Sequence, residues 1–303
     1  MAWAKEIRRK ISSIKNTWKI TKAMELISTV KMKKAQDSVM AKKEIVLEIL
    51  KVFARIEDSL SWYPLFDNWL WDKTLAVVIT SNKWLCWWYN IWVMKKINSY
   101  IKETNEVIDF ITVWKKAANF VSKTWNNLIA DFSKDFTDNI KPIYTKRISR
   151  LLKDEFMSWA YKKVVVFYSH YINTIKQIPV NKDFLPISSV DIKNYLSEII
   201  EDSYDIELEL KADIESQNDY KIEPSKEELA EHIIPIILDM MFYDLLLESK
   251  ASEHSSRMIA MKNAKDNAAK IAWNLTLKYN KARQAIITKE VSEITSWVES
   301  LKD

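Results

Sequence analysis

The sequence contains no glycine, although it is 303 residues long. Average usage of about 7% would give a chain of this length roughly twenty glycines. Turns that need a positive φ angle are costly for every residue that carries a Cβ, so a chain without glycine has few ways to turn tightly. Any fold for this sequence must avoid such turns or tolerate strain in them.

The sequence has 14 tryptophans instead, and many lie in turn contexts where glycine is expected. They are densest between residues 81 and 90, which include Trp84, Trp87 and Trp88. Our hypothesis is that many or all of these tryptophans are glycines in the organism. A UGA codon that the cell decodes as glycine is printed as tryptophan when UGA is translated as tryptophan. The alternative is a tryptophan-rich protein with an aromatic binding surface.

The rest of the composition excludes several classes of protein. A hydrophobic fraction of 48% and a charged fraction of 29% are those of an ordinary globular chain. The single cysteine, Cys86, excludes an internal disulfide framework and a cysteine-rich zinc site. His170, His232 and His254 are too scattered to suggest a metal cluster. Because no apolar run reaches twenty residues, we expect no membrane span. The lysine-rich start lacks the apolar core of a signal peptide, so we expect none.

Residues 1–60 are expected to form a long helix that takes part in a coiled coil. Apolar side chains such as Ile7, Ile11 and Ile14 recur at steps of three and four residues, and the segment contains no proline. A helix of this length, on the order of 80–90 Å, needs a partner to cover its apolar stripe. The segment is also basic, with 14 Lys and Arg against 7 Asp and Glu.

Residues 225–303 are expected to form the partner helix. Ser225 followed by Glu228 is a capping-box pattern, which marks the start of a helix. An apolar face follows and ends in smaller residues such as Ala264 and Ala268, which let two helix axes approach closely. The two terminal segments are therefore predicted to pack as an antiparallel coiled coil.

The middle of the chain, residues 70–222, is predicted to be an α/β domain. Strands that alternate with helices favour a parallel-leaning sheet covered by helices. The expected strands are 74–80, 106–113 and 164–171, with extended segments at 175–180 and 205–211, and the expected helices are 89–102, 115–123 and 149–160.

The sequence contains no familiar catalytic motif. Walker, nucleophile-elbow and His-Glu-x-x-His patterns are absent. The segment 81–90 follows a strand and precedes a helix, a place where phosphate can bind, but without GxGxxG spacing a structural turn is favoured. One alternative function is a nucleotide-dependent α/β enzyme that uses this turn, with Glu103 or Glu106 on a ribose. Another is a basic coiled coil that binds nucleic acid.

Several stretches, from the opening Ala2–Gln36 to the closing Leu275–Ile294, resemble the gamma subunit of F-type ATP synthases. The opening from Ala2 to Gln36 is similar to the start of that family, with Trp3 where the family has glycine. Lys83–Asn90 resembles the family's Gly-Leu-Cys-Gly-Gly-Tyr-Asn segment, with tryptophans at its three glycines. The resemblance extends over essentially the whole chain, through Phe184–Ile187, Tyr220–Ser225, Arg257–Ala268 and Leu275–Ile294.

The resemblance implies both a fold and a function. It implies a long antiparallel coiled coil of the two termini with a central Rossmann-like α/β domain, acting as the rotor stalk of a rotary ATP synthase. The implied partners are the hexamer of alpha and beta subunits, the epsilon subunit and the membrane c-ring. The implied location is peripheral, on the cytoplasmic side of the cell membrane.

The resemblance also implies which residues matter. It implies no catalytic residue, metal, cofactor, small-molecule ligand or nucleic acid for this subunit. Arg257 and Gln284 match family residues that contact the catch region of beta, and Lys22, Met24 and Glu25 lie in the matching segment of the first helix.

Overall fold

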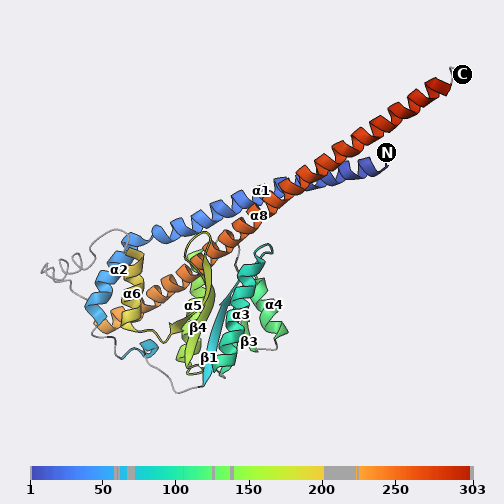
Figure 1. Cartoon of the computed structure of the whole chain (residues 1–303). Coiled ribbons are helices and arrows are strands. Elements are labelled where there is room, and N and C mark those ends of the chain that lie inside the picture. Colours follow the sequence, from blue (N-terminus) through green and yellow to red (C-terminus); the bar gives the residue numbers. More distant parts are fainter. Residues whose placement is uncertain are drawn as a thin grey trace. The chain divides into compact units, whose positions relative to one another are not determined.

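The computed structural model describes residues 2–57, 60, 62–66, 72–104, 106–124, 127–136, 140–200, 223 and 225–300. By their contacts the residues form two compact units. We call residues 1–29 with 257–303 the helix-pair unit, and residues 30–256 the α/β unit. Two long helices, α1 (Ala2–Met40) and α8 (Lys226–Ser300), contribute to both units (Figure 1).

In the helix-pair unit α1 and α8 run antiparallel, with the start of α1 and the end of α8 at the same end (Figure 1). The less exposed side chains of this part of α1 include a heptad series, namely Ile7, Ile11, Ile14, Trp18, Thr21, Glu25 and Ser28, and Met24 lies beside it. On α8 the corresponding side chains include Met261, Ala264, Ala268 and Ala272. Small residues at this seam allow close approach of the two axes, and the predicted antiparallel pair is confirmed.

The first helix is shorter than the sequence pattern predicts. α1 ends at Met40, and α2 (Lys43–Ile56) follows after a two-residue turn. The prediction of one helix through residue 60 is therefore wrong. The reason is that α2 packs its apolar face, including fully buried Val46 and Phe53, into the core of the α/β unit. Because the three- and four-residue spacing continues across the turn, periodicity alone does not reveal the break.

The α/β unit is built around a five-stranded sheet with the order β3-β2-β1-β4-β5. The first four strands of this order are parallel, and β5 is antiparallel to β4. The strands are β1 (Lys73–Ile79), β2 (Val107–Val113), β3 (Asn127–Asp131), β4 (Lys163–Tyr171) and β5 (Gln177–Leu185). The three strands predicted in the middle domain are confirmed, β5 begins and ends later than expected, and β3 was not predicted. The extended segment expected at 205–211 lies outside the described residues.

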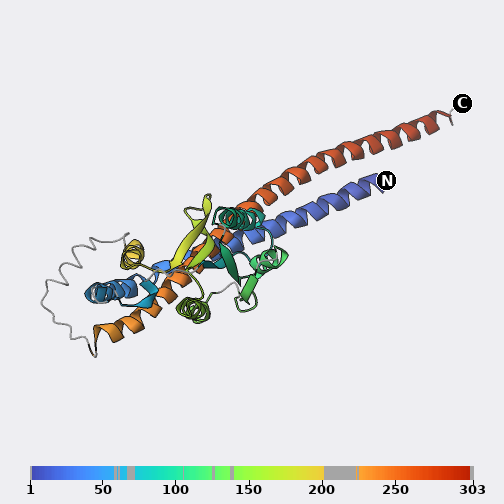
Figure 2. The ribbon, with the colours of Figure 1, turned by 90° about the horizontal axis from the view of Figure 1, so that it is seen from below.

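Helices cover both faces of the sheet (Figure 2). α3 (Trp87–Thr104) and α4 (Lys115–Lys123) pack on the face that carries Ala76 and Val78. The opposite face carries Leu75 and Val77, which pack in a larger core. That core also takes in side chains from α2, α8, α5 (Pro142–Met157) and α6 (Ser189–Ile200).

The helix starts show where the sequence pattern was adequate. Ser225 Oγ accepts a hydrogen bond from the backbone N–H of Glu228 at 3.2 Å, which confirms the predicted cap of α8. α5 begins earlier than the predicted residue 149, with Pro142 in its first turn, where a missing N–H costs nothing.

None of the helices among the described residues combines the length and the apolar character that a membrane span requires. The domain limits drawn at 60, 70, 222 and 225 stay a prediction.

Candidate functional site

Three of the residues implied by the resemblance lie on neighbouring turns of α1 in the helix-pair unit. Lys22 is exposed, and its Nζ lies 5.0 Å from the centre of the Trp18 ring. Met24 is half-buried. Glu25 is also half-buried, and its Oε2 accepts a hydrogen bond from Lys265 Nζ on α8 at 2.7 Å. This bond raises the pKa of Lys265, and it links the two helices at this level.

The other two implied residues lie elsewhere on α8. Arg257 is buried, whereas Gln284 is exposed. They are separated by roughly 40 Å along the helix axis, given a rise of 1.5 Å per residue. The five residues therefore form no single cluster, and any contacts that they make with partners are made at separate levels of the helix pair.

The segment between β1 and α3 is held together by one amide. Asn90 Oδ1 accepts a hydrogen bond from the backbone N–H of Ser81 at 3.0 Å. Asn90 Nδ2 donates to Ser81 Oγ at 2.8 Å and to the carbonyl oxygen of Cys86 at 3.4 Å. The side chain of Asn90 thus fills the inside of the turn, which supports a structural role over phosphate binding. Trp84, Trp87 and Trp88 are all exposed around it.

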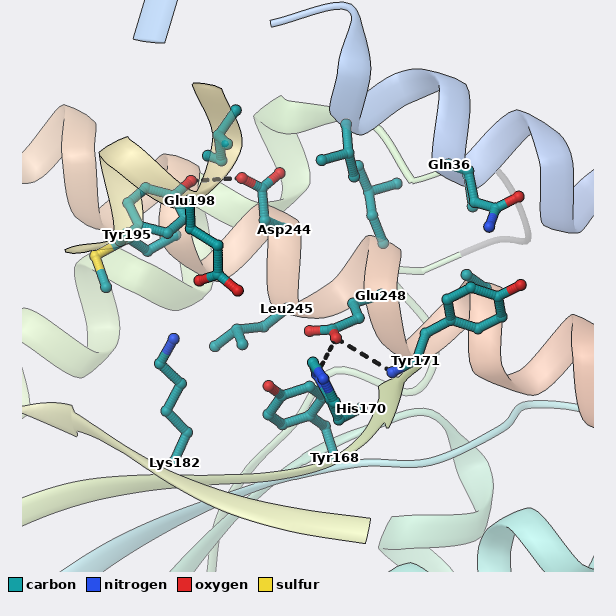
Figure 3. Close-up of a pocket in the computed structure, with 16 residues that line it drawn as sticks. Gln36, Tyr168, His170, Tyr171, Lys182, Tyr195, Glu198, Asp244, Leu245 and Glu248 are labelled. Carbon is teal, nitrogen blue, oxygen red and sulfur yellow. Dashed lines mark hydrogen bonds and ion pairs between the residues drawn. The ribbon is translucent and has the colours of Figure 1, made fainter. Parts of the chain in front are cut away.

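The α/β unit also contains a cavity of about 430 Å³ that no sequence pattern indicated (Figure 3). Its walls come from the last turns of α1, from β4 and β5, and from α6 and α8. The labelled side chains in Figure 3 are mostly polar or charged, and they include Tyr168, His170, Lys182, Tyr195, Glu198, Asp244 and Glu248.

Three of the charged side chains that line this cavity, His170, Asp244 and Glu248, form ion pairs or hydrogen bonds. Glu248 pairs with His170 Nδ1 and accepts the backbone N–H of Tyr171 at 3.2 Å. Asp244 accepts hydrogen bonds from the Tyr195 hydroxyl and from Lys42 Nζ. Among these residues no nucleophile stands beside an available base, so the geometry suggests a packed polar wall rather than a catalytic centre.

The ionisation of these groups follows from their surroundings. The hydrogen bond that His170 donates to Glu248 raises the pKa of His170 and favours the imidazolium. Burial raises the pKa of Asp244 and lowers that of Lys42 in spite of their ion pair. His170 and Glu248 are 78 residues apart, so no local sequence signal could have joined them. Among the described residues, no group of three or more His, Cys, Asp and Glu side chains could hold a metal ion.

Comparisons with known proteins decide between the alternatives. A family model described as ATP synthase matches residues 3–301. An ATP synthase gamma chain from Flavobacterium psychrophilum is 34% identical over 307 aligned residues, which cover 100% of both chains. One from Roseiflexus sp. is 32% identical over 315 aligned residues, again 100% of both. The chain belongs to the ATP synthase gamma chain family.

Solved structures show the same fold for this gamma chain. A chain of the Euglena gracilis mitochondrial ATP synthase, in a structure of OSCP, F1 and the c-ring, superposes with a TM-score of 0.58 at 17% identity. The match covers 99% of our chain and 95% of the Euglena chain. A chain from the central stalk and c-ring of the Tetrahymena thermophila enzyme gives a TM-score of 0.54 at 20% identity, with 81% and 99% covered.

Proposed function

We propose that this gamma chain is the central rotor stalk of a rotary ATP synthase. The main support is that known gamma chains match this chain over its full length at 34% and 32% identity. In addition, its two terminal segments form the expected antiparallel helix pair. As a gamma chain it is a non-catalytic subunit, and the chemistry of ATP takes place on the beta subunits. Its own part is to couple ion flow through the membrane ring to the conformational cycle of those subunits.

The surface of the helix-pair unit suits a shaft enclosed by partners. Beside the seam, many large apolar side chains remain exposed, among them Ile20, Leu26, Ile27, Ile271, Leu277, Ile287, Val291 and Ile294. Exposed apolar surface on this scale marks a contact region. We place this unit inside the hexamer of alpha and beta subunits, where each rotation angle presents a different face to each beta subunit. A face that binds one beta conformation better shifts the population toward that conformation.

The remaining partners and the location follow from the same proposal. We assign the α/β unit to contact with the epsilon subunit and the c-ring, which places the chain at the cytoplasmic face of the cell membrane as a peripheral subunit. We assign contacts with the catch region of beta to Arg257 and Gln284. We also assign subunit contacts to Lys22, Met24 and Glu25 on α1. The basic charge of residues 1–60 suits an acidic loop of beta.

Gln284 gives the sharpest test because it is exposed, so its replacement leaves the core intact. The complex is assembled from this chain and its own alpha and beta subunits, and rotation and ATP turnover are measured. We expect Gln284→Ala to lower turnover several-fold. Asn280→Ala, one turn away on the exposed surface of α8, is the matched control and should leave turnover unchanged.

Assays of the isolated chain distinguish the rotor function from the alternative functions. Alone it should hydrolyse no ATP, and it should restore rotation when it is added to the hexamer. Sustained ATP turnover by the isolated chain would instead favour the enzyme, and salt-sensitive binding of duplex DNA or RNA without effect on the hexamer would favour the nucleic-acid binder. Equal ATP turnover for Gln284→Ala and its control would show that Gln284 does not contact the catch region of beta.

A further inference from the structure

The tryptophans of this chain lie where aromatic side chains are least expected. Of the eleven whose side chains the structure describes, nine are exposed, among them Trp84 at 75% and Trp297 at 74%. The ten phenylalanines provide an internal comparison, since all of them are buried or half-buried. Indole and phenyl rings have similar reasons to leave water. Within the same fold, phenylalanine therefore behaves as a core residue and tryptophan mostly as a surface residue.

Trp159 occupies a helix end that is built for glycine. It follows Ser158, the C-cap of α5, and has a φ angle of 64°. The backbone N–H of Trp159 donates to the carbonyl oxygen of Phe156 at 3.2 Å, one of the two bonds of a Schellman motif. The residue at this position adopts the left-handed conformation, where a Cβ is penalised and glycine is the usual choice.

Trp114 has a backbone conformation that is essentially restricted to glycine. It connects β2 to α4 with φ 72° and ψ 155°. Its indole is fully buried, and Nε1 has no hydrogen-bond partner among the described residues. Trp114 and Trp159 account for two of the three positive-φ residues of the described chain, and the third, Leu85, directly follows Trp84. The positive φ of Leu85 itself is not explained by its side chain.

The turn between β1 and α3 adds a separate argument. Trp87 and Trp88 are adjacent in the first turn of α3, and both are more than 60% exposed. A chain of this length carries roughly twenty glycines on average, a number close to the 14 tryptophans found and far from the zero glycines.

We propose that the codons behind these tryptophans are read as glycine in the organism, so that the native protein carries glycine at Trp84, Trp87, Trp88, Trp114 and Trp159. Reassignment acts on a codon and not on a site, so every tryptophan that shares the same codon changes with them. This includes helix-interior positions such as Trp273, which have no need of glycine. The proposal does not depend on the rotor function, because it concerns turn geometry and composition alone.

The decisive measurement is the peptide mass spectrum of the native protein, purified from its own cells within its complex. Peptides that span residues 81–90, 114 and 159 should show the mass of glycine at each tryptophan position. The unfolded native protein should also show less tryptophan fluorescence than a chain that carries all 14 tryptophans. Tryptophan mass at positions 84, 87 and 88 would overturn the proposal and restore the reading of an aromatic surface.

A second measurement tests the backbone argument with synthetic genes that specify each residue by an ordinary codon. At position 159, glycine should give a higher Tm than alanine by a few degrees, because only glycine adopts positive φ without penalty. At position 273, in the interior of α8, the order should reverse, because alanine favours a helix more than glycine does. Alanine equal to glycine at position 159, or no reversal at position 273, would contradict the geometric basis of the proposal.

Discussion

The two units of this gamma chain bury their side chains in different ways. The core of the α/β unit is dense and aromatic, with Phe53, Phe156 and Phe242 fully buried. The seam of the helix-pair unit contains small and polar residues such as Ser28 and Ala268, and much apolar surface beside it stays exposed. Burial of apolar area is the main source of folding free energy. The α/β unit can therefore be stable by itself, whereas the helix pair relies on partners to cover its sides.

The largest expected effect lies in the core of the α/β unit. Phe242 is fully buried and packs edge-to-face against Phe184, with 5.8 Å between ring centres. Phe242→Ala should lower the free energy of unfolding by about 3–5 kcal/mol, because it leaves a cavity that the sheet cannot close. Urea unfolding followed by circular dichroism measures this. Ile7→Ala, at the seam of the helix pair, should lower the free energy of unfolding clearly less. An equal decrease in the two variants would contradict the proposed difference between the units.

An intermediate effect is expected at the seam. Ala268 is buried between the helices, while its neighbour Ala269 is exposed. Ala268→Leu should destabilise the helix pair by about 1–3 kcal/mol through overpacking. Ala269→Leu should change stability by no more than about 0.5 kcal/mol. Hydrogen exchange of residues 257–300 measures both, and equal protection in the two variants would show that the axes are not closely packed.

The smallest effect concerns pH. Glu248 raises the pKa of His170 above its value in the unfolded chain, so the pair stabilises the fold fully at pH values below about 6.5. This contribution is lost as the pH rises through the higher pKa of the folded state. Because the pair is partly exposed, the loss should be at most about 1 kcal/mol. Nearby Glu198 raises the pKa of His170 further and Lys182 lowers it.

Thermal unfolding between pH 5 and pH 9 measures this dependence. His170→Gln should flatten the profile while the fold persists. If the stability of His170→Gln depends on pH as steeply as that of the wild type, other titratable groups cause the pH dependence.

The sequence predicted the buried parts of the fold better than its edges. β1 was predictable because six of its seven residues are buried, which gives a continuous apolar run. β3 was missed because it has five residues, alternates between exposed and half-buried, and lies at the edge of the sheet. The break between α1 and α2 was missed because the helical spacing runs through it. Only the three-dimensional core shows that Val46 belongs with the sheet.

The candidate site was predictable only in part. The family motifs led to Glu25 on α1, and the structure adds its partner Lys265, a link across 240 residues. The cavity with His170 and Glu248 had no local signal, since its walls come from five separate elements. Sequence spacing reports which residues share one helix face, but it does not report which faces meet.

The two edge strands of the sheet have a consequence for the chain before it meets its partners. Unpaired backbone groups on an edge strand can template pairing with a second copy. β5 carries Pro179, which has no N–H to offer, and the charged neighbours Lys182 and Asp183. β3 is short and ends in Asp131. Newly made chains should therefore resist sheet-to-sheet aggregation while they wait for assembly.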